Sequence, residues 1–120
     1  MSDSPEVTEA VAELGRCRDE IEAIDHQIIE LLARRMTLGR RTGDLKRLAA
    51  LPILDPTREA AVIRRVAGEA REAGLPTEPI REIFWQIVGM SRRAQEWEEP
   101  SDPAPVSPPT SDAEGEATPE

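Results

Sequence analysis

Cysteine and histidine are nearly absent from this chain of 120 residues, which contains only Cys17 and His26. A single cysteine cannot build a disulfide framework. Zinc sites need three or four His, Cys or carboxylate ligands at short spacings, and the sequence lacks the usual set. A nucleophilic triad would have to use His26, whose neighbours Asp25 and Gln27 indicate a solvated helix face. We therefore expect neither a metal site nor nucleophilic catalysis.

Clustered positive charge is missing as well. The formal net charge is −9, and the 15 basic residues all lie within residues 1–98, where 18 acidic residues outnumber them. Residues 99–120 contain six acids, no base and six of the 11 prolines. Phosphate binding needs a clustered cationic excess, so we expect no nucleic-acid partner. The composition of residues 99–120 is typical of a disordered acidic tail, which cannot bury enough apolar surface to fold.

Long apolar runs are the third absence. No run approaches the ~20 residues that are needed to cross a bilayer. The first 15 residues contain four acids, and they lack the basic and apolar regions of a signal peptide. The sequence therefore predicts a cytoplasmic protein that has no membrane partner.

The strongest pattern in the chain is helical periodicity over its first half. No proline occurs between Val7 and Leu48, and apolar residues recur there at heptad spacing. A helix over residues 7–48 would be ~60 Å long. Because a domain of this size cannot cover such a helix alone, we expect a partner chain. The apolar residues form two rows: Leu14, Ile21 and Ile28 in one, and Cys17, Ile24, Leu31, Leu38 and Leu45 in the other.

Two shorter helices are predicted to follow. Asp55 and Pro56 are typical of an N-cap and a first helical residue, and Gly74 is suited to the other end of that helix. Gly39 and Gly43 in the first helix are assigned to close helix packing. We predict an all-α domain over residues 7–98, with helices at about 7–48, 56–73 and 78–97, between a frayed segment at 1–6 and the tail at 99–120.

Several polar residues interrupt the predicted apolar stripes. Arg35 continues the first row, and Lys46 returns to nearly the same side of the helix eleven residues later. Glu59 lies on the apolar stripe of the second helix, and Ser91 and Gln95 continue that of the third. Buried charges are costly unless they are paired. The pattern predicts either an internal salt-bridge network, in which Arg35 and Lys46 pair with Glu59 and Asp55, or, because cations are in excess, a pocket for a small anion.

Two basic residues bear on this choice. Lys46 is the only lysine beside 14 arginines. This suggests a role that arginine cannot fill, although codon drift in a G+C-rich genome also produces such a skew. Arg18 lies 17 residues before Arg35, ~25 Å along the helix, and could reach the same small ligand only from another subunit. The alternative for Arg18 is a surface pair with Glu22.

The order of the motifs along the chain is more specific than any one of them. Together they resemble the all-helical (type II) chorismate mutases, from about Leu14 to Gln95 and with no apparent insertion or deletion. The matching pieces are Arg18-Asp19-Glu20-Ile21 with Ile24-Asp25, Leu31-Leu32-Ala33-Arg34-Arg35, Gly43-x-x-Lys46, Pro52-Ile53-x-Asp55-x-x-Arg58-Glu59, and Phe84-x-x-Ile87-x-x-x-Ser91-x-x-x-Gln95.

This resemblance implies an intertwined homodimer of three-helix chains, with the long first helices paired and two equivalent sites. It implies the conversion of chorismate to prephenate by a [3,3] rearrangement in phenylalanine and tyrosine biosynthesis, with neither metal nor cofactor. In each site Arg18 would come from the other subunit. The remaining substrate-binding residues would come from one subunit: Arg35, Lys46, Asp55, Arg58, Glu59, Ser91 and Gln95.

The resemblance also implies roles for these residues. Arg18 and Arg35 would clamp the two carboxylates of the substrate, because a planar guanidinium binds a carboxylate in bidentate fashion. Lys46 and Gln95 would stabilise the negative charge that develops on the breaking ether oxygen. The catalytic residues would thus be Lys46, Gln95 and Arg35, while Glu59 would accept a hydrogen bond from the ring hydroxyl.

Three alternatives use the same scaffold. Isochorismate-pyruvate lyases are similar but lack the features at Asp55 and at Arg58-Glu59. Aminodeoxychorismate mutases tend to differ at the hydroxyl-binding glutamate, so Glu59 favours a ring hydroxyl. Some stand-alone mutases are weak alone and are activated by the first enzyme of the shikimate pathway, which would then be a partner of this chain.

Overall fold

The computed structural model describes residues 4–97. This part of the chain consists of three α-helices without a β-strand, and the predicted all-α class with a very long first helix is confirmed. Residues 1–3 and the predicted tail at 99–120 lie outside the described residues. The helices are α1 (Pro5–Leu48), α2 (Pro56–Glu72) and α3 (Thr77–Glu96).

The start of α1 differs from the predicted frayed segment at residues 1–6. Ser4 is the N-cap, and its side chain accepts a hydrogen bond from the Val7 amide at 3.1 Å. Pro5 takes the first helical position, where its missing N–H costs nothing. Residues 4–6 therefore form a capped helix start, because Ser4 accepts from a free N–H group of the first turn and Pro5 has no N–H group to satisfy.

The ends of α2 follow the expected signals. The Asp55 side chain accepts from the Arg58 amide at 3.1 Å, and Pro56 is the first helical residue. Gly74 follows the C-cap Ala73 with a φ of 74°, a left-handed conformation that glycine adopts without strain. The end of α1 uses Ala50 in the same role, at a φ of 57°. No glycine marks that turn in the sequence.

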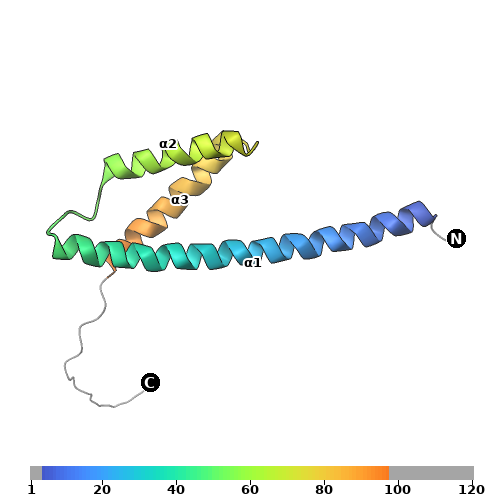
Figure 1. Ribbon diagram of the computed structural model, residues 1–120, viewed down its shortest axis with the longest axis horizontal. Helices are drawn as coiled ribbons and strands as arrows, with labels where there is room; N and C mark the ends of the chain where they lie inside the picture. The colour runs from blue at the N-terminus through green and yellow to red at the C-terminus, as the bar shows by residue number, and fades with distance from the viewer. Residues whose placement is uncertain (1–3, 98–120) are drawn as a thin grey trace, which may run out of the picture.

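α3 joins the other two helices. It packs on α1 and on α2, whereas α1 and α2 do not pack against each other within the described residues. Figure 1 shows α3 running diagonally from the end of α2 to the C-terminal third of α1. The apolar core is small and lies between α2 and α3. It consists of Val62, Ile63, Val66 and Val88, with Phe84 packed against them.

The backbones of α1 and α3 approach closely where they cross. Gly39 and Gly43 are the buried residues of α1. A Cβ atom on Gly43 would overlap the backbone of Gln95, and one on Gly39 would lie 3.2 Å from the Ser91 hydroxyl oxygen. The predicted role of both glycines in close helix packing is confirmed.

The N-terminal part of α1 has no covering element in this chain. Every described residue before Leu32 is exposed, including the predicted solvated His26. The two apolar rows are open to solvent, with 57% exposure at Ile21, 52% at Ile24 and 56% at Leu31. None of the described helices is long and apolar enough to cross a membrane.

The helix crossing predicts opposite effects for two glycine substitutions. Gly43→Ala is expected to lower the free energy of unfolding by ~1–3 kcal/mol, because the new methyl group overlaps backbone that cannot rotate away. Gly15→Ala is the control, since a Cβ atom there would have nothing within 4 Å. It is expected to stabilise α1 by up to ~1 kcal/mol. Urea unfolding measures both, and equal effects would contradict the close crossing.

Candidate active site

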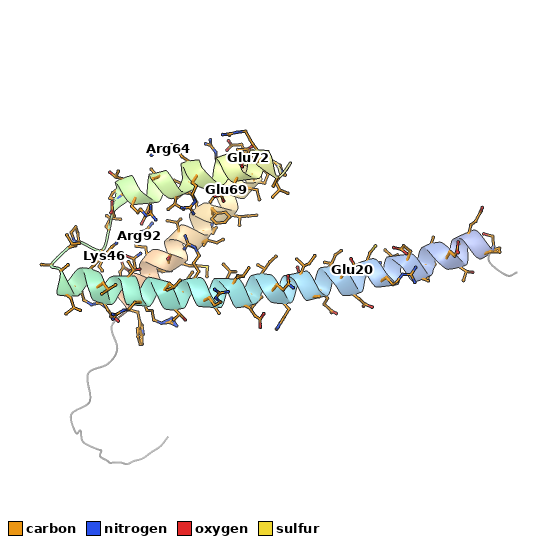
Figure 2. The ribbon with its side chains drawn as sticks, viewed as in Figure 1. Glu20, Lys46, Arg64, Glu69, Glu72 and Arg92 are labelled. Carbon is orange, nitrogen blue, oxygen red and sulfur yellow. The ribbon has the colours of Figure 1, made fainter. Side chains whose placement is uncertain are left out.

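A pocket of about 430 Å³ lies where the three helices meet. This volume is in the range that binds small molecules. Leu38, Val62 and Val88 form its apolar walls. Figure 2 shows Lys46 on α1 and Arg92 on α3 in the angle between α1 and α2, while Glu20 lies on the extended part of α1. The polar residues that line the pocket are Arg35, Thr42, Lys46, Asp55, Arg58, Glu59, Ser91 and Gln95.

The structure thus brings together seven of the eight substrate-binding residues expected from the sequence. Arg18 is the exception. It is exposed on the uncovered part of α1, and the 17 residues that separate it from Arg35 correspond to ~25 Å of helix. Within one chain, Arg18 cannot contact a small molecule in this pocket. Among residues 4–97, no three His, Cys, Asp or Glu side chains gather closely enough to hold a metal ion.

Lys46 and Gln95 are in direct contact. The Lys46 ammonium donates to the Gln95 side-chain oxygen at 2.7 Å and to the Ile53 carbonyl at 2.8 Å. Because an ammonium only donates, the amide oxygen of Gln95 must face it, which leaves the amide NH₂ pointing elsewhere. The third N–H of Lys46 and the NH₂ of Gln95 have no hydrogen-bond acceptor within the described residues. The pair therefore offers donors to a molecule in the pocket.

The backbone at Gln95 is held by Arg47, which the sequence did not indicate. The Arg47 guanidinium donates to the Gln95 carbonyl at 2.9 Å, to the Trp97 carbonyl at 3.3 Å and to Asp44 at 2.7 Å. The last carbonyls of a helix lack partners in the helix itself. Arg47 supplies those partners and so fastens the end of α3 to the end of α1. The sequence offered one signal for this role of Arg47: it is a basic residue in the last turn of α1, next to Lys46.

Arg92 is a second residue that sequence reasoning missed. Its guanidinium donates from Nε to Glu59 Oε2 at 2.9 Å and from Nη2 to Glu59 Oε1 at 3.1 Å. The salt-bridge alternative had paired Glu59 and Asp55 with Arg35 and Lys46, and it is wrong. Within residues 4–97, neither Arg35 nor Lys46 forms an ion pair. Glu59 pairs with α3 because α1 and α2 are held apart.

The electrostatics of the pocket favour an anion. Four cations, Arg35, Lys46, Arg58 and Arg92, stand on or beside its wall against the two acids Asp55 and Glu59. Burial, and then the charge of nearby Arg65, lower the pKa of Arg35. A lowered pKa means that the surroundings disfavour the guanidinium cation, and a bound carboxylate would relieve this cost. The excess of two positive charges matches a dianion.

The fold and the pocket together define an all-helical domain with a polar pocket in which cations outnumber acids. The chain belongs to the chorismate mutase type II family, whose sequence profile matches residues 17–96. The resemblance that the sequence motifs indicated is confirmed.

Known proteins show the same relationship. The T-protein of Enterobacter agglomerans is 35% identical over 78 residues, which are 65% of this chain and 21% of that protein. The chorismate mutase of Methanocaldococcus jannaschii is 26% identical over 85 residues, 71% of this chain and 86% of its own. A solved structure, a conserved hypothetical protein from Pyrococcus furiosus, is 40% identical with a TM-score of 0.56, and the match covers 69% of this chain and 95% of that one. The chain spans about a fifth of the length of the T-proteins that it matches.

Proposed function

We propose that this protein is a chorismate mutase, which converts chorismate to prephenate by a [3,3] rearrangement in the biosynthesis of phenylalanine and tyrosine. One observation carries the proposal: a single pocket combines an excess of positive charge, two units when Arg92 behind its wall is counted, with the unused donors of Lys46 and Gln95. Membership of the chorismate mutase type II family supports it.

The first task of the site is to hold a reactive conformer. Chorismate carries two carboxylates, and its side chain must fold over the ring before the bond can form. Arg35 lines the pocket without an ion-pair partner within the described residues, so its fork is available to one carboxylate. Arg18 of a second copy binds the other. Fixing both ends of the substrate lowers the barrier through orientation.

The second task is to stabilise the charge that develops. In the rearrangement a C–O bond breaks while a C–C bond forms, and no proton is transferred. The ether oxygen gains negative charge in the transition state. The third N–H of Lys46 and the NH₂ of Gln95 donate to that oxygen. Both groups are oriented beforehand, because the Lys46 ammonium donates to the Ile53 carbonyl and to the side-chain oxygen of Gln95.

The ring hydroxyl of the substrate binds at the wall of the pocket opposite Lys46 and Gln95. Glu59 accepts its hydrogen bond, with the help of the Asp55 backbone. Ser91 and Arg58 complete the polar lining of the pocket. Glu59 is on α2 and Gln95 is at the end of α3, so the substrate spans the angle between the helices.

A homodimer completes each site. The two apolar rows of α1 are exposed in one chain, and an exposed apolar surface of this extent marks a protein interface. Pairing of the α1 helices of two copies covers these rows. In a two-fold dimer the exchange is reciprocal, so each copy gives its Arg18 to the other site.

Removal of either ether-oxygen donor tests the proposed reaction. Lys46→Ala and Gln95→Ala are each expected to lower kcat by about 10²–10³-fold, while the helix content is retained. The assay follows the disappearance of chorismate by absorbance and identifies the product. Gln86→Ala, on the exposed face of α3, is the matched control and keeps the wild-type kcat. Unchanged kcat in both site variants would overturn the proposal.

The pH profile gives an independent test. The amide of Gln95 carries its protons at every pH, so kcat is expected to stay constant from about pH 5 to pH 8. In Gln95→Glu, only the protonated carboxyl group can donate. Activity of that variant is therefore expected to fall as the pH rises through this range. A steep fall in the wild type would contradict donation by the amide.

Shared sites predict complementation between two inactive variants. Arg18→Ala and Lys46→Ala, refolded together, form hybrid dimers in which one site has both wild-type residues. Random pairing restores about a quarter of the wild-type activity. Lys46→Ala mixed with Gln95→Ala is the control, and it restores none, because both residues of a site come from one chain. Absence of recovery in the first mixture would rule out a site shared between copies.

A further inference from the structure

The pair of Glu59 and Arg92 is the ion pair on the pocket wall. Two parallel hydrogen bonds of 2.9 and 3.1 Å join the guanidinium to the two carboxylate oxygens. The Glu59 side chain is 16% exposed and that of Arg92 is 32% exposed. A bidentate contact fixes the plane of the carboxylate as well as its position.

Arg92 acts through Glu59. Glu59 lines the pocket, whereas Arg92 stands behind it and is not among the lining residues. Each carboxylate oxygen has two acceptor positions, and Arg92 occupies one on each, so Glu59 keeps acceptor positions for a donor in the pocket. The hydrogen bonds and the charge of Glu59 raise the pKa of Arg92, with a smaller contribution from Glu96. The pair therefore presents an acceptor with its charge already balanced.

We propose that Arg92 is a positioning residue that makes this pocket select a neutral hydroxyl over a cationic amine at the ring position of the substrate. The inference rests on the proposed mutase function and adds a determinant of its specificity. The observation behind it is the bidentate contact between the Arg92 guanidinium on α3 and the Glu59 carboxylate on α2.

The physical reason is the net charge at the acceptor. A carboxylate without a partner attracts an ammonium group more strongly than a hydroxyl, because the hydrogen bond is then charge-assisted on both sides. Once Arg92 has balanced Glu59, an ammonium gains little from the pair and meets the guanidinium charge behind it. Arg35, Lys46 and Arg58 add to the repulsion. A hydroxyl loses nothing, because it carries no charge.

Among the described residues, Arg92 is the side chain that can perform this role. Arg58 neighbours Glu59 in sequence, yet it forms no ion pair with it there. The α1 cations Arg35 and Lys46 likewise form no ion pair with Glu59 within the described residues. Arg92 also belongs to the helix that carries Ser91 and Gln95. Its contact therefore sets the position of the hydroxyl acceptor relative to the ether-oxygen donor.

Two substitutions separate charge from geometry. Arg92→Gln keeps one donor but removes the charge, and Arg92→Lys keeps the charge but loses the bidentate fork. The full chain is assayed with chorismate and with the analogue that has an amine in place of the ring hydroxyl. In Arg92→Gln, the ratio of the two kcat/KM values is expected to shift about tenfold or more towards the amine, chiefly through KM. In Arg92→Lys, the ratio stays near the wild-type value while both KM values rise.

Two controls show whether the effect passes through Glu59. Arg93→Gln, on the next residue of α3, removes a charge that does not contact Glu59, and it is expected to leave the ratio unchanged. In a Glu59→Gln background, Arg92→Gln is expected to shift the ratio less than it does in the wild type, because no carboxylate then remains at that position to pair with the ammonium group.

Thermal unfolding establishes that each variant is folded. An unchanged ratio of the two kcat/KM values in Arg92→Gln, or a shift of the same size in the Glu59→Gln background, would overturn the role of Arg92. Calorimetric dissociation constants for the two substrates, measured with and without Arg92→Gln in the slow Lys46→Ala background, give the same comparison from binding. A wild-type protein that binds but does not convert chorismate would therefore refute the mutase function alone.

Discussion

The close crossing of α1 and α3 is the contact on which the other features depend. Gly39 and Gly43 let the two backbones touch, and a side chain at Gly43 would occupy the space of the Gln95 backbone. Only at this distance can Lys46 reach the Gln95 amide. The crossing also forms one wall of the pocket. A packing constraint between two helices is thus the origin of the arrangement of donors.

α3 positions the residues that the other two helices contribute to the site. It is the helix that packs on both others, and its side chains contact a pocket residue of each: Gln95 meets Lys46 of α1, and Arg92 meets Glu59 of α2. The apolar core is small, so these contacts carry much of the geometry of the site. Preorganised donors are effective because they do not have to reorient during the reaction.

Assembly and function are connected through α1. The C-terminal third of α1 belongs to the domain, while the rest projects beyond it with its apolar rows exposed (Figure 1). In the dimer that we propose, the surface that holds the two copies together also carries Arg18 to the second site. Loss of the dimer would then remove Arg18, a residue that binds the substrate, and would also lower the stability of the protein. The long helix thus serves both purposes.

The sequence by itself determined the helices and most of the pocket. Apolar periodicity and the caps at Asp55 and Gly74 are local signals, and polar residues on apolar stripes identified Lys46 and Glu59 as inward-facing. Only the tertiary structure decided the partners. Glu59 pairs with Arg92, 33 residues away, and Lys46 with Gln95, 49 residues away. Helical periodicity gives the face on which a side chain lies. Which long side chains meet across two faces depends on how the helices cross.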